Sequence, residues 1–273
     1  GWCGRRGWPV QLEGVTSMLN LERLQDITKE LQEKKAVTVK ALAAKYFASE
    51  ATIRRDLESL AKSGFVRRTY GGAILVEDPY AEIPLKVRHG DHKRPKEIIA
   101  QLAAQLVSDN KIVFIDSSST ALHMIPYLKD KAGLTIITNG ARTAVECGES
   151  LNGKIYCTGG ILRENSLSFI GEAARRNVDH YFTDIAFFSN RAISLENGVT
   201  DYNEAESELR QQMIHNTKKA VLLMDSSKFD QNSFCKVCTL EQVDTIITDR
   251  APSDAWIDKL KKIGTELIYP VNS

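Results

Sequence analysis

The chain has 273 residues, of which 42% are hydrophobic and 26% charged, and its formal net charge is +1. These proportions are typical of a soluble globular protein. No run of about 18 apolar residues is present, which excludes a membrane-spanning helix, and we expect a cytoplasmic protein. The length favours two domains, because a first module of about 60 residues leaves about 190 for a second core.

Residues 1–17 differ in composition from the rest of the chain. They contain Arg5 and Arg6 but no apolar stretch of about seven residues, which argues against a secretory signal. We expect a disordered extension here, with Met18 as the natural start of the protein.

A helix is predicted over residues 50–62, with Ser49 as its N-cap. Apolar side chains recur along it at three- and four-residue spacing, as at Ile53 and Leu57, whereas the opposite face is basic. Gly64 ends the helix, because glycine adopts the left-handed cap conformation at low cost.

The neighbouring segments complete a winged helix-turn-helix at 18–76. An apolar stripe predicts a first helix over 21–35, and Thr38 caps a shorter second helix. After the basic helix, β-like runs at 65–69 and 73–76 flank a glycine-containing turn, as the wing of such a module requires.

Double-stranded operator DNA is the expected partner of this module. Residues 18–76 carry eleven Lys and Arg against seven Asp and Glu, a net charge of +4 in a chain of only +1. The alternative is an amphipathic helix whose charged face is merely solvated. A basic helix in the major groove beside a basic wing along the backbone favours DNA. The predicted DNA-contacting residues are Ser49, Glu50, Thr52, Arg54, Arg55, Arg67, Arg68 and Tyr70.

These residues resemble a known family. Thr52-Ile53-Arg54-Arg55-Asp56-Leu57, followed by Gly64, Arg68 and Gly71-Gly72-Ala73, is similar to the N-terminal signature of the DeoR family of bacterial transcriptional regulators. Tyr70 stands where that family usually has histidine.

The remainder of the chain predicts an α/β domain. Three prolines interrupt residues 77–96, where we expect a linker or a short connecting helix. Residues 97–273 alternate apolar strands with helical patterns, which indicates a mostly parallel sheet covered on both faces. Strands are expected at 111–116, 134–138, 154–158, 185–189, 220–224 and 245–248, and helices at 98–107, 120–128, 141–147 and 205–216.

Hydroxyl- and glycine-rich loops follow five of these strands. In parallel sheets, ligands bind where the carboxyl ends of strands meet helix N-termini. Small donors there can hold a phosphate, with Lys228 or Arg210 supplying positive charge, and Asp116 and Asp225 can accept hydrogen bonds from sugar hydroxyls. The alternative is that the Ser and Thr side chains only cap helices. The predicted effector residues are Asp116, Ser117, Ser118, Ser119, Thr120, Thr138, Asn139, Gly159, Gly160, Arg210 and Lys228.

This half also resembles the C-terminal effector domain of the DeoR family. The matching segments are 116–120, Thr138-Asn139, Gly159-Gly160, 206–214 and Asp225-Ser226-Ser227-Lys228-Phe229. The resemblance implies a sugar-phosphate sensor that is related in fold to ribose-phosphate isomerases and works as an oligomer. The chain departs from the family pattern at Ser118, where a loop glycine is usual, and at Arg210-Gln211, where Lys-Arg is usual.

We therefore expect a transcriptional regulator, in the first instance a repressor, of a sugar uptake or catabolism operon under the control of a phosphorylated sugar. One alternative is an isomerase-like enzyme, for which Asp116, Glu206 and Glu208 are the candidate bases. Another is a DNA-binding protein whose second domain serves only assembly. A homo-oligomer is expected, without catalytic residues, cofactor or membrane partner.

The cysteines do not change this interpretation. Five cysteines in 273 residues do not make a disulfide scaffold. Cys235 and Cys238 have the spacing of a CxxC motif, but no second pair or nearby histidines complete a metal site. We expect neither metal binding nor redox chemistry.

Overall fold

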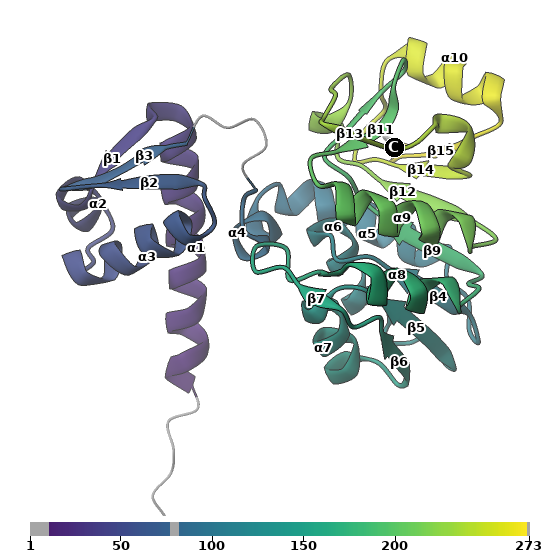
Figure 1. Ribbon diagram of the computed structural model, residues 1–273, viewed down its shortest axis with the longest axis horizontal. Coiled ribbons are helices and arrows are strands. Elements are labelled where there is room, and N and C mark those ends of the chain that lie inside the picture. Colours follow the sequence, from purple (N-terminus) through teal and green to yellow (C-terminus); the bar gives the residue numbers. More distant parts are fainter. Residues whose placement is uncertain (1–10, 77–81, 272–273) are drawn as a thin grey trace, which may run out of the picture. The chain divides into compact units, whose positions relative to one another are not determined.

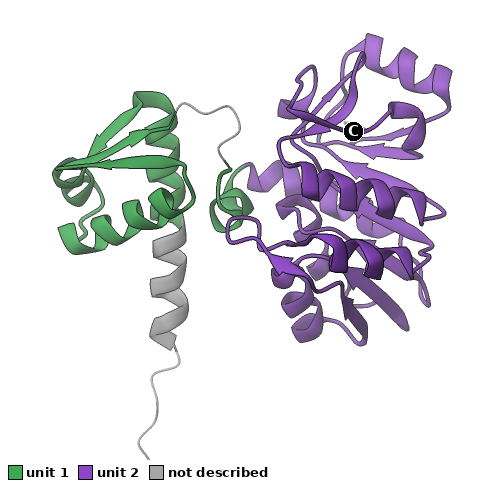
Figure 2. Cartoon of the chain, viewed as in Figure 1, with its two compact units in different colours: residues 1–91 green, residues 92–273 purple. Residues whose placement is uncertain are grey.

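The computed structural model describes residues 11–76 and 82–271, with side chains described from residue 22 onward. The chain divides into two compact units, 1–91 and 92–273 (Figure 2). Each unit has its own hydrophobic core and is described here by itself.

Unit 1 is a winged helix-turn-helix (Figure 1). Its three strands form an antiparallel sheet in the order β1-β3-β2. Its elements are α1 (Gln11–Lys34), β1 (Ala36–Thr38), α2 (Val39–Lys45), α3 (Glu50–Lys62), β2 (Val66–Thr69), β3 (Gly72–Leu75) and α4 (Leu85–Gly90).

The predicted caps of unit 1 are confirmed. Thr38 Oγ1 accepts a hydrogen bond from Ala41 N at 3.2 Å, and Ser49 Oγ accepts one from Thr52 N at 3.1 Å. Gly64, just beyond α3, has a φ of +75°. These caps orient α2 and α3 so that their apolar stripes meet α1 in one core.

Helix α1 corrects one expectation. It begins at Gln11, so the extension predicted to be disordered over 1–17 is helical from Gln11 onward. Residues 1–10 lie outside the described residues. Helix α1 therefore begins ten residues before the apolar stripe at 21–35 from which the helix was predicted.

The turn between α2 and α3 contains a strained residue. Phe47 has a φ of +49°, a left-handed conformation in which a Cβ atom crowds the following carbonyl oxygen, and its ring is 98% exposed. We expect Phe47→Gly to raise the free energy of unfolding by about 1 kcal/mol, because it removes the strain without loss of packing. Thermal unfolding of the Phe47→Gly and Phe47→Ala variants checks this. The alanine variant keeps its Cβ and should not be stabilised.

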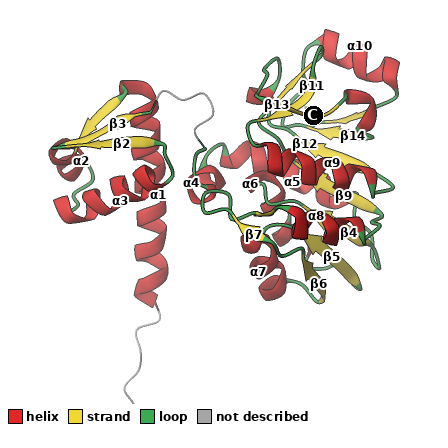
Figure 3. Ribbon diagram, viewed as in Figure 1, coloured by secondary structure: helices red, strands yellow, loops and turns green. Residues whose placement is uncertain are grey.

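Unit 2 is built on a seven-stranded sheet in the order β15-β14-β12-β9-β4-β5-β6, in which every pair is parallel (Figure 3). The strands of this sheet are β4 (Ile112–Ile115), β5 (Leu134–Thr138), β6 (Gly153–Cys157), β9 (Ile185–Phe188), β12 (Ala220–Leu223), β14 (Thr245–Ile247) and β15 (Glu266–Ile268). The helices are α5 (Lys93–Gln105), α6 (Ser119–Leu122), α7 (Ala141–Ser150), α8 (Glu172–Asp179), α9 (Glu204–His215) and α10 (Asp254–Ile263).

Side chains that alternate along the strands bury both faces of this sheet. Val113 and Ile115 of β4 pack with α5, α6 and α7, whereas Phe114 packs with α8, α9 and α10. The second layer also contains a small antiparallel sheet of β10 (Ala192–Ser194), β11 (Gly198–Asp201) and β13 (Cys235–Cys238). The mostly parallel α/β fold predicted from the sequence is confirmed.

The described part of the segment at 77–96, where we expect a linker or a short connecting helix, contains two helical stretches. It contains α4, and α5 begins at Lys93 rather than at Ile98. Pro95 lies in the first turn of α5, where a proline is tolerated because the backbone N–H groups have no partner within the helix. The two short strands β7 (Ile161–Leu162) and β8 (Phe169–Ile170), which form a hairpin, were also not predicted.

Candidate DNA interface and effector site

The predicted DNA-contacting residues of α3 and the wing are mostly on the surface. Arg54, Arg55, Arg67, Arg68 and Tyr70 are exposed, whereas Thr52 is half-buried. Ser49 and Glu50 are exposed at the start of α3. The surface of α3 opposite its apolar stripe is therefore open to a duplex.

The wing and α3 are joined by a hydrogen bond. Arg68 Nη1 of β2 donates to the backbone oxygen of Arg54 at 2.9 Å. Arg54 also forms an ion pair with Glu50, with 2.6 Å between Nη2 and Oε2. The side chains of Arg54 and Glu50, both predicted to contact DNA, are therefore paired with each other in the free protein.

Asp56, within the Thr-Ile-Arg-Arg-Asp-Leu motif, has a structural role. It is buried, and its carboxylate accepts hydrogen bonds from Arg23 Nε at 2.6 Å and from Arg23 Nη2 at 3.3 Å. This bidentate ion pair fastens α3 to α1. The motif therefore combines exposed groups for DNA with one buried group for the fold.

The polar loops of unit 2 converge at the carboxyl edge of the sheet. Because β6, β5, β4 and β9 are adjacent, the segments after them lie side by side. Asn139 Oδ1 accepts a hydrogen bond from Ser117 N at 3.1 Å, and Thr158 N donates to Thr138 O at 2.9 Å. The segments at 116–120 and at 138–139 are buried, as is Thr158.

The two glycines after β6 meet different surroundings. Gly159 has a φ of +62° and Gly160 a φ of +111°, so both occupy backbone conformations that favour glycine. A Cβ at Gly160 would lie 2.6 Å from the backbone oxygen of Ile170, whereas one at Gly159 would meet nothing within 4 Å. Of these two glycines, only Gly160 has neighbours that leave no room for a side chain. At Gly159 the space that a Cβ atom would occupy is empty.

Some of the hydroxyl groups do cap helices. Ser118 Oγ accepts a hydrogen bond from Ala121 N at 3.2 Å as the N-cap of α6. Asn190, after β9, has a different environment. Its Nδ2 donates to Asp201 Oδ2 at 2.8 Å, but its buried Oδ1 has no hydrogen-bond partner within the described part of the chain.

Arg210 does not supply free positive charge, contrary to the expectation from the sequence. It is buried, and its nitrogens lie 3.1 Å from Asp116 Oδ2, 3.1 Å from Asp201 Oδ2 and 3.4 Å from Glu206 Oε2. Burial lowers the pKa of the guanidinium, but the carboxylates, with Asp201 and Asp116 foremost, raise it overall. Arg210 is therefore the centre of a buried ionic network.

Asp116 belongs to the same network. Its Oδ1 accepts a hydrogen bond from Ser118 N at 2.9 Å, and its Oδ2 accepts one from Ser189 N at 3.3 Å in addition to that from Arg210. Both carboxylate oxygens are engaged within the protein. Asp116 thus orders the loops after β4 and β9, and its predicted contact with a sugar hydroxyl stays a prediction.

Glu206 completes the network on the other side of Arg210. It forms an ion pair with Arg163, with 2.7 Å between Oε1 and Nη1, and accepts a hydrogen bond from Ser168 Oγ. Burial alone would raise the pKa of Glu206, but the guanidiniums of Arg210 and Arg163, with the nearby hydroxyls, lower it to about 2. Sequence reasoning missed the roles of Asp201 and Arg163, because nothing in their local sequence marks them.

Lys228 is the cation at the edge of this cluster. It is half-buried, its Nζ donates to Ser189 Oγ at 3.2 Å, and it lies 3.6 Å from Asp225 Oδ2. Burial would raise the pKa of Asp225, but the Lys228 ammonium and the Ser227 hydroxyl lower it below its usual range. Lys228 therefore reaches the loop after β9 from the loop after β12.

Cys235 and Cys238, which have the CxxC spacing, have thiol groups whose pKa is raised by burial, in Cys238 to about 12. Across residues 11–76 and 82–271 there is no group of three His, Cys, Asp or Glu that could hold a metal ion.

Among the same residues, no helix is both long and apolar enough to cross a bilayer.

An exposed basic helix with a wing, joined in one chain to an α/β unit with a polar site at its strand ends, defines a DNA-binding transcriptional regulator with a sensor domain. Residues 23–78 match the DeoR-like helix-turn-helix domain, and residues 91–250 match the DeoR C-terminal sensor domain. The chain belongs to the DeoR family of transcriptional regulators.

Similar proteins cover almost the whole chain. An uncharacterized HTH-type transcriptional regulator, YulB of Bacillus subtilis, is 34% identical over 89% of this chain and 94% of its own length. The HTH-type transcriptional regulator GolR of Listeria innocua is 33% identical over 90% and 97%. A putative aga operon transcriptional repressor of Escherichia coli O157:H7 is 32% identical over 90% and 93%. Among solved structures, ribose 5-phosphate isomerase A of Methanocaldococcus jannaschii has a TM-score of 0.37 and 16% identity, over 51% of this chain and 55% of that one.

Proposed function

We propose that this regulator represses a sugar uptake or catabolism operon and that a phosphorylated sugar, bound at the carboxyl edge of the unit 2 sheet, relieves the repression. The observation that carries the proposal is the buried Oδ1 of Asn190, which has no partner within the described residues and lies among the polar loops of that edge. A buried unsatisfied acceptor costs about 1–3 kcal/mol, which a hydroxyl donor from a bound sugar would offset.

The phosphate end of the ligand is assigned to the loops near Lys228. Lys228 is positioned by Ser189, and the open backbone at Gly159 and the buried hydroxyls after β4 provide small donors. One relative is a putative aga operon transcriptional repressor, which supports repression of an operon as the function. We retain all predicted effector residues as the site region, with Arg210 and Asp116 as positioning residues.

DNA binding and effector binding are coupled if the ligand has different affinities for the DNA-competent and the DNA-incompetent state. Operator half-sites read by two winged helices require at least a dimer, so we propose a homo-oligomer in the cytoplasm.

The isomerase alternative is disfavoured by the state of its candidate bases. Glu206, with a pKa of about 2 and two arginine partners, is a poor proton acceptor at neutral pH. Asp116 has both oxygens engaged, and Glu208 is exposed and paired with Arg175 at 3.2 Å. We therefore propose that the chain is not an enzyme.

The direct test is operator binding with and without a panel of sugar phosphates. We expect Lys228→Ala to weaken the effector response about tenfold to a hundredfold, because a charge-assisted phosphate contact is lost, while DNA affinity without effector is unchanged. Mobility shifts on DNA from upstream of the gene measure both quantities. An unchanged response in Lys228→Ala would refute this phosphate placement. Wild-type binding to DNA that no sugar phosphate alters would favour the assembly-only alternative.

The DNA interface has its own test. We expect Arg55→Ala to weaken DNA binding about tenfold and to reduce the salt dependence by about one counterion, because Arg55 is exposed on α3 and meets phosphate or base edges. Titrations at several salt concentrations measure both effects. Arg142→Ala, at an exposed site of α7, is the matched control and should change neither. Equal affinity for wild type and Arg55→Ala would exclude this face of α3.

A further inference from the structure

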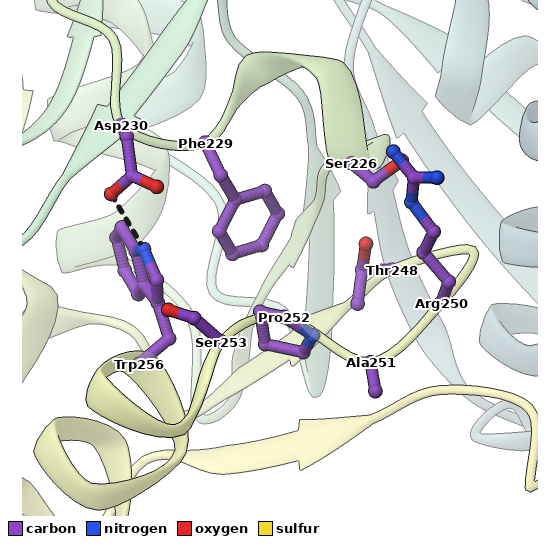
Figure 4. A pocket seen from close by; sticks show the side chains of 9 residues that line it. All are labelled: Ser226, Phe229, Asp230, Thr248, Arg250, Ala251, Pro252, Ser253 and Trp256. Atoms are coloured by element: carbon purple, nitrogen blue, oxygen red, sulfur yellow. Dashed lines mark hydrogen bonds between the residues drawn. The ribbon is translucent and has the colours of Figure 1, made fainter.

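A cavity lies in unit 2 at the carboxyl edge of the sheet, beside the proposed effector residue Lys228. It has a volume of about 270 Å³ and opens where β12 and β14 end and α10 begins (Figure 4). The lining side chains used here are those of Ser226, Phe229, Thr248, Arg250, Pro252 and Trp256. The predicted effector residues are absent from its lining.

Thr248 contributes an unsatisfied hydroxyl group to the lining of this cavity. The residue is fully buried, and its Oγ1 has no hydrogen-bond partner in the described part of the chain. In Figure 4 the hydroxyl points into the space between Phe229 and Ser226. A hydroxyl buried in this way costs about 1–3 kcal/mol unless something in the cavity satisfies it.

One end of the cavity is polar. Arg250 is exposed there, beside Ser226. The Ser226 hydroxyl donates to Asp249 Oδ2 at 3.1 Å, so it is fixed in place and keeps only acceptor capacity. The side-chain donors at this end that have no hydrogen-bond partner among the described residues are the exposed guanidinium and the buried Thr248 hydroxyl, which suit an oxyanion.

The other end is an aromatic wall. The rings of Phe229 and Trp256 meet edge to face with centroids 4.9 Å apart, and Pro252 lies below them in Figure 4. Trp256 Nε1 donates a hydrogen bond to Asp230 Oδ1 at 2.9 Å. The indole N–H and the Asp230 carboxylate at this end are therefore already paired with each other. The wall therefore presents a rigid apolar surface, against which a compact ring can pack.

We propose that this cavity is a second small-molecule site, which takes an oxyanion, a carboxylate or a phosphate monoester, carried on a compact apolar ring. The anionic group lies between Arg250 and Thr248, and the ring packs against Phe229 and Pro252. Ser226 and Phe229 flank the effector residue Lys228 in sequence, but none of the predicted effector residues lines this cavity, so its ligand is separate from the sugar phosphate.

The experiment uses Trp256 as a reporter in the full chain. Replacing Trp2 and Trp8 by phenylalanine leaves Trp256 as the single tryptophan, since the sequence contains three. We expect benzoate or phenyl phosphate to produce a saturable change in its fluorescence, and the comparison of the two distinguishes a carboxylate site from a phosphate site. Thr248→Val and Arg250→Gln should each weaken that binding about tenfold or more, because each removes a hydrogen bond to the anion.

Two controls separate this site from the rest of the protein. Lys228→Ala should leave the affinity for the probe unchanged, because Lys228 belongs to the proposed effector site. Thr248→Val should unfold at the same or a higher temperature than its parent, since valine has nearly the same shape without the hydroxyl.

The proposal is overturned if neither anion gives a saturable change, if both variants bind as the parent does, or if phenol binds as tightly as the anions. It is also overturned if Lys228→Ala abolishes the signal, since the probe would then occupy the effector site. None of these outcomes depends on a response of DNA binding to sugar phosphates, so the two proposals fail separately.

Discussion

Replacing Arg210 by methionine is expected to lower the free energy of unfolding of unit 2 by about 3–5 kcal/mol. The guanidinium is buried and lies within 3.4 Å of three carboxylates, those of Asp116, Asp201 and Glu206. Without it these groups remain buried, and Glu206 keeps Arg163 as an ion-pair partner. Chemical denaturation followed by the fluorescence of Trp256, which lies in the core of unit 2, measures the loss.

Arg142→Met is the matched control for that change. Arg142 forms an ion pair with Glu146 on the surface of α7, with 2.6 Å between Nε and Oε1, and its loss should cost no more than about 0.5 kcal/mol. If Arg210→Met destabilised unit 2 no more than Arg142→Met does, the buried network would not hold the strand-end loops together.

Gly72→Ala is expected to destabilise unit 1 by about 3 kcal/mol, at the upper end of the usual cost of overpacking, and to abolish DNA binding. A Cβ at Gly72 would lie 1.9 Å from the backbone oxygen of Val37 and 2.9 Å from Thr38 Cα, where β3 pairs with β1. Since these are backbone atoms, no rotamer change relieves the clash, and the wing has to separate from β1. Thermal unfolding and DNA titration measure the two effects.

The adjacent glycine provides the comparison. A Cβ at Gly71 would meet nothing within 4 Å, so Gly71→Ala should leave stability within about 0.5 kcal/mol of wild type and should preserve DNA binding. Similar behaviour of the Gly71 and Gly72 variants would show that β1 does not pair with the wing as described.

Elements with strong periodicity could be predicted from the sequence. Helix α3 and strand β5 lie where their apolar patterns place them. Strand β1 could not be predicted, because it has three residues and is defined by its pairing with β3, distant in the chain. In the sheet of β10, β11 and β13, the pairing of β11 with β13 likewise joins segments far apart in sequence.

The convergence of the polar loops at one edge of the sheet was predicted from the sequence, whereas the contacts within them were not. Loop composition after the strands identified the polar edge of the sheet, because parallel strands bring their carboxyl ends together. The role of Arg210 could not be predicted, since its partner Asp116 lies 94 residues away and the ion pair exists only in the folded chain. The residues next to an arginine in the sequence do not show whether its guanidinium will be buried in an ion pair or exposed.

The hydrogen bond from Arg68 to the backbone of Arg54 has a consequence for the shape of the operator. This bond joins β2 to α3, and Phe65 N donates a second hydrogen bond to Leu60 O where the helix meets the wing. The two bonds hold the wing and the helix at a fixed separation. The distance along the duplex between the bases met by α3 and the flanking backbone met by the wing is then constant. Base changes within a half-site should alter affinity gradually, whereas one inserted base pair within it should remove one of the two contacts altogether.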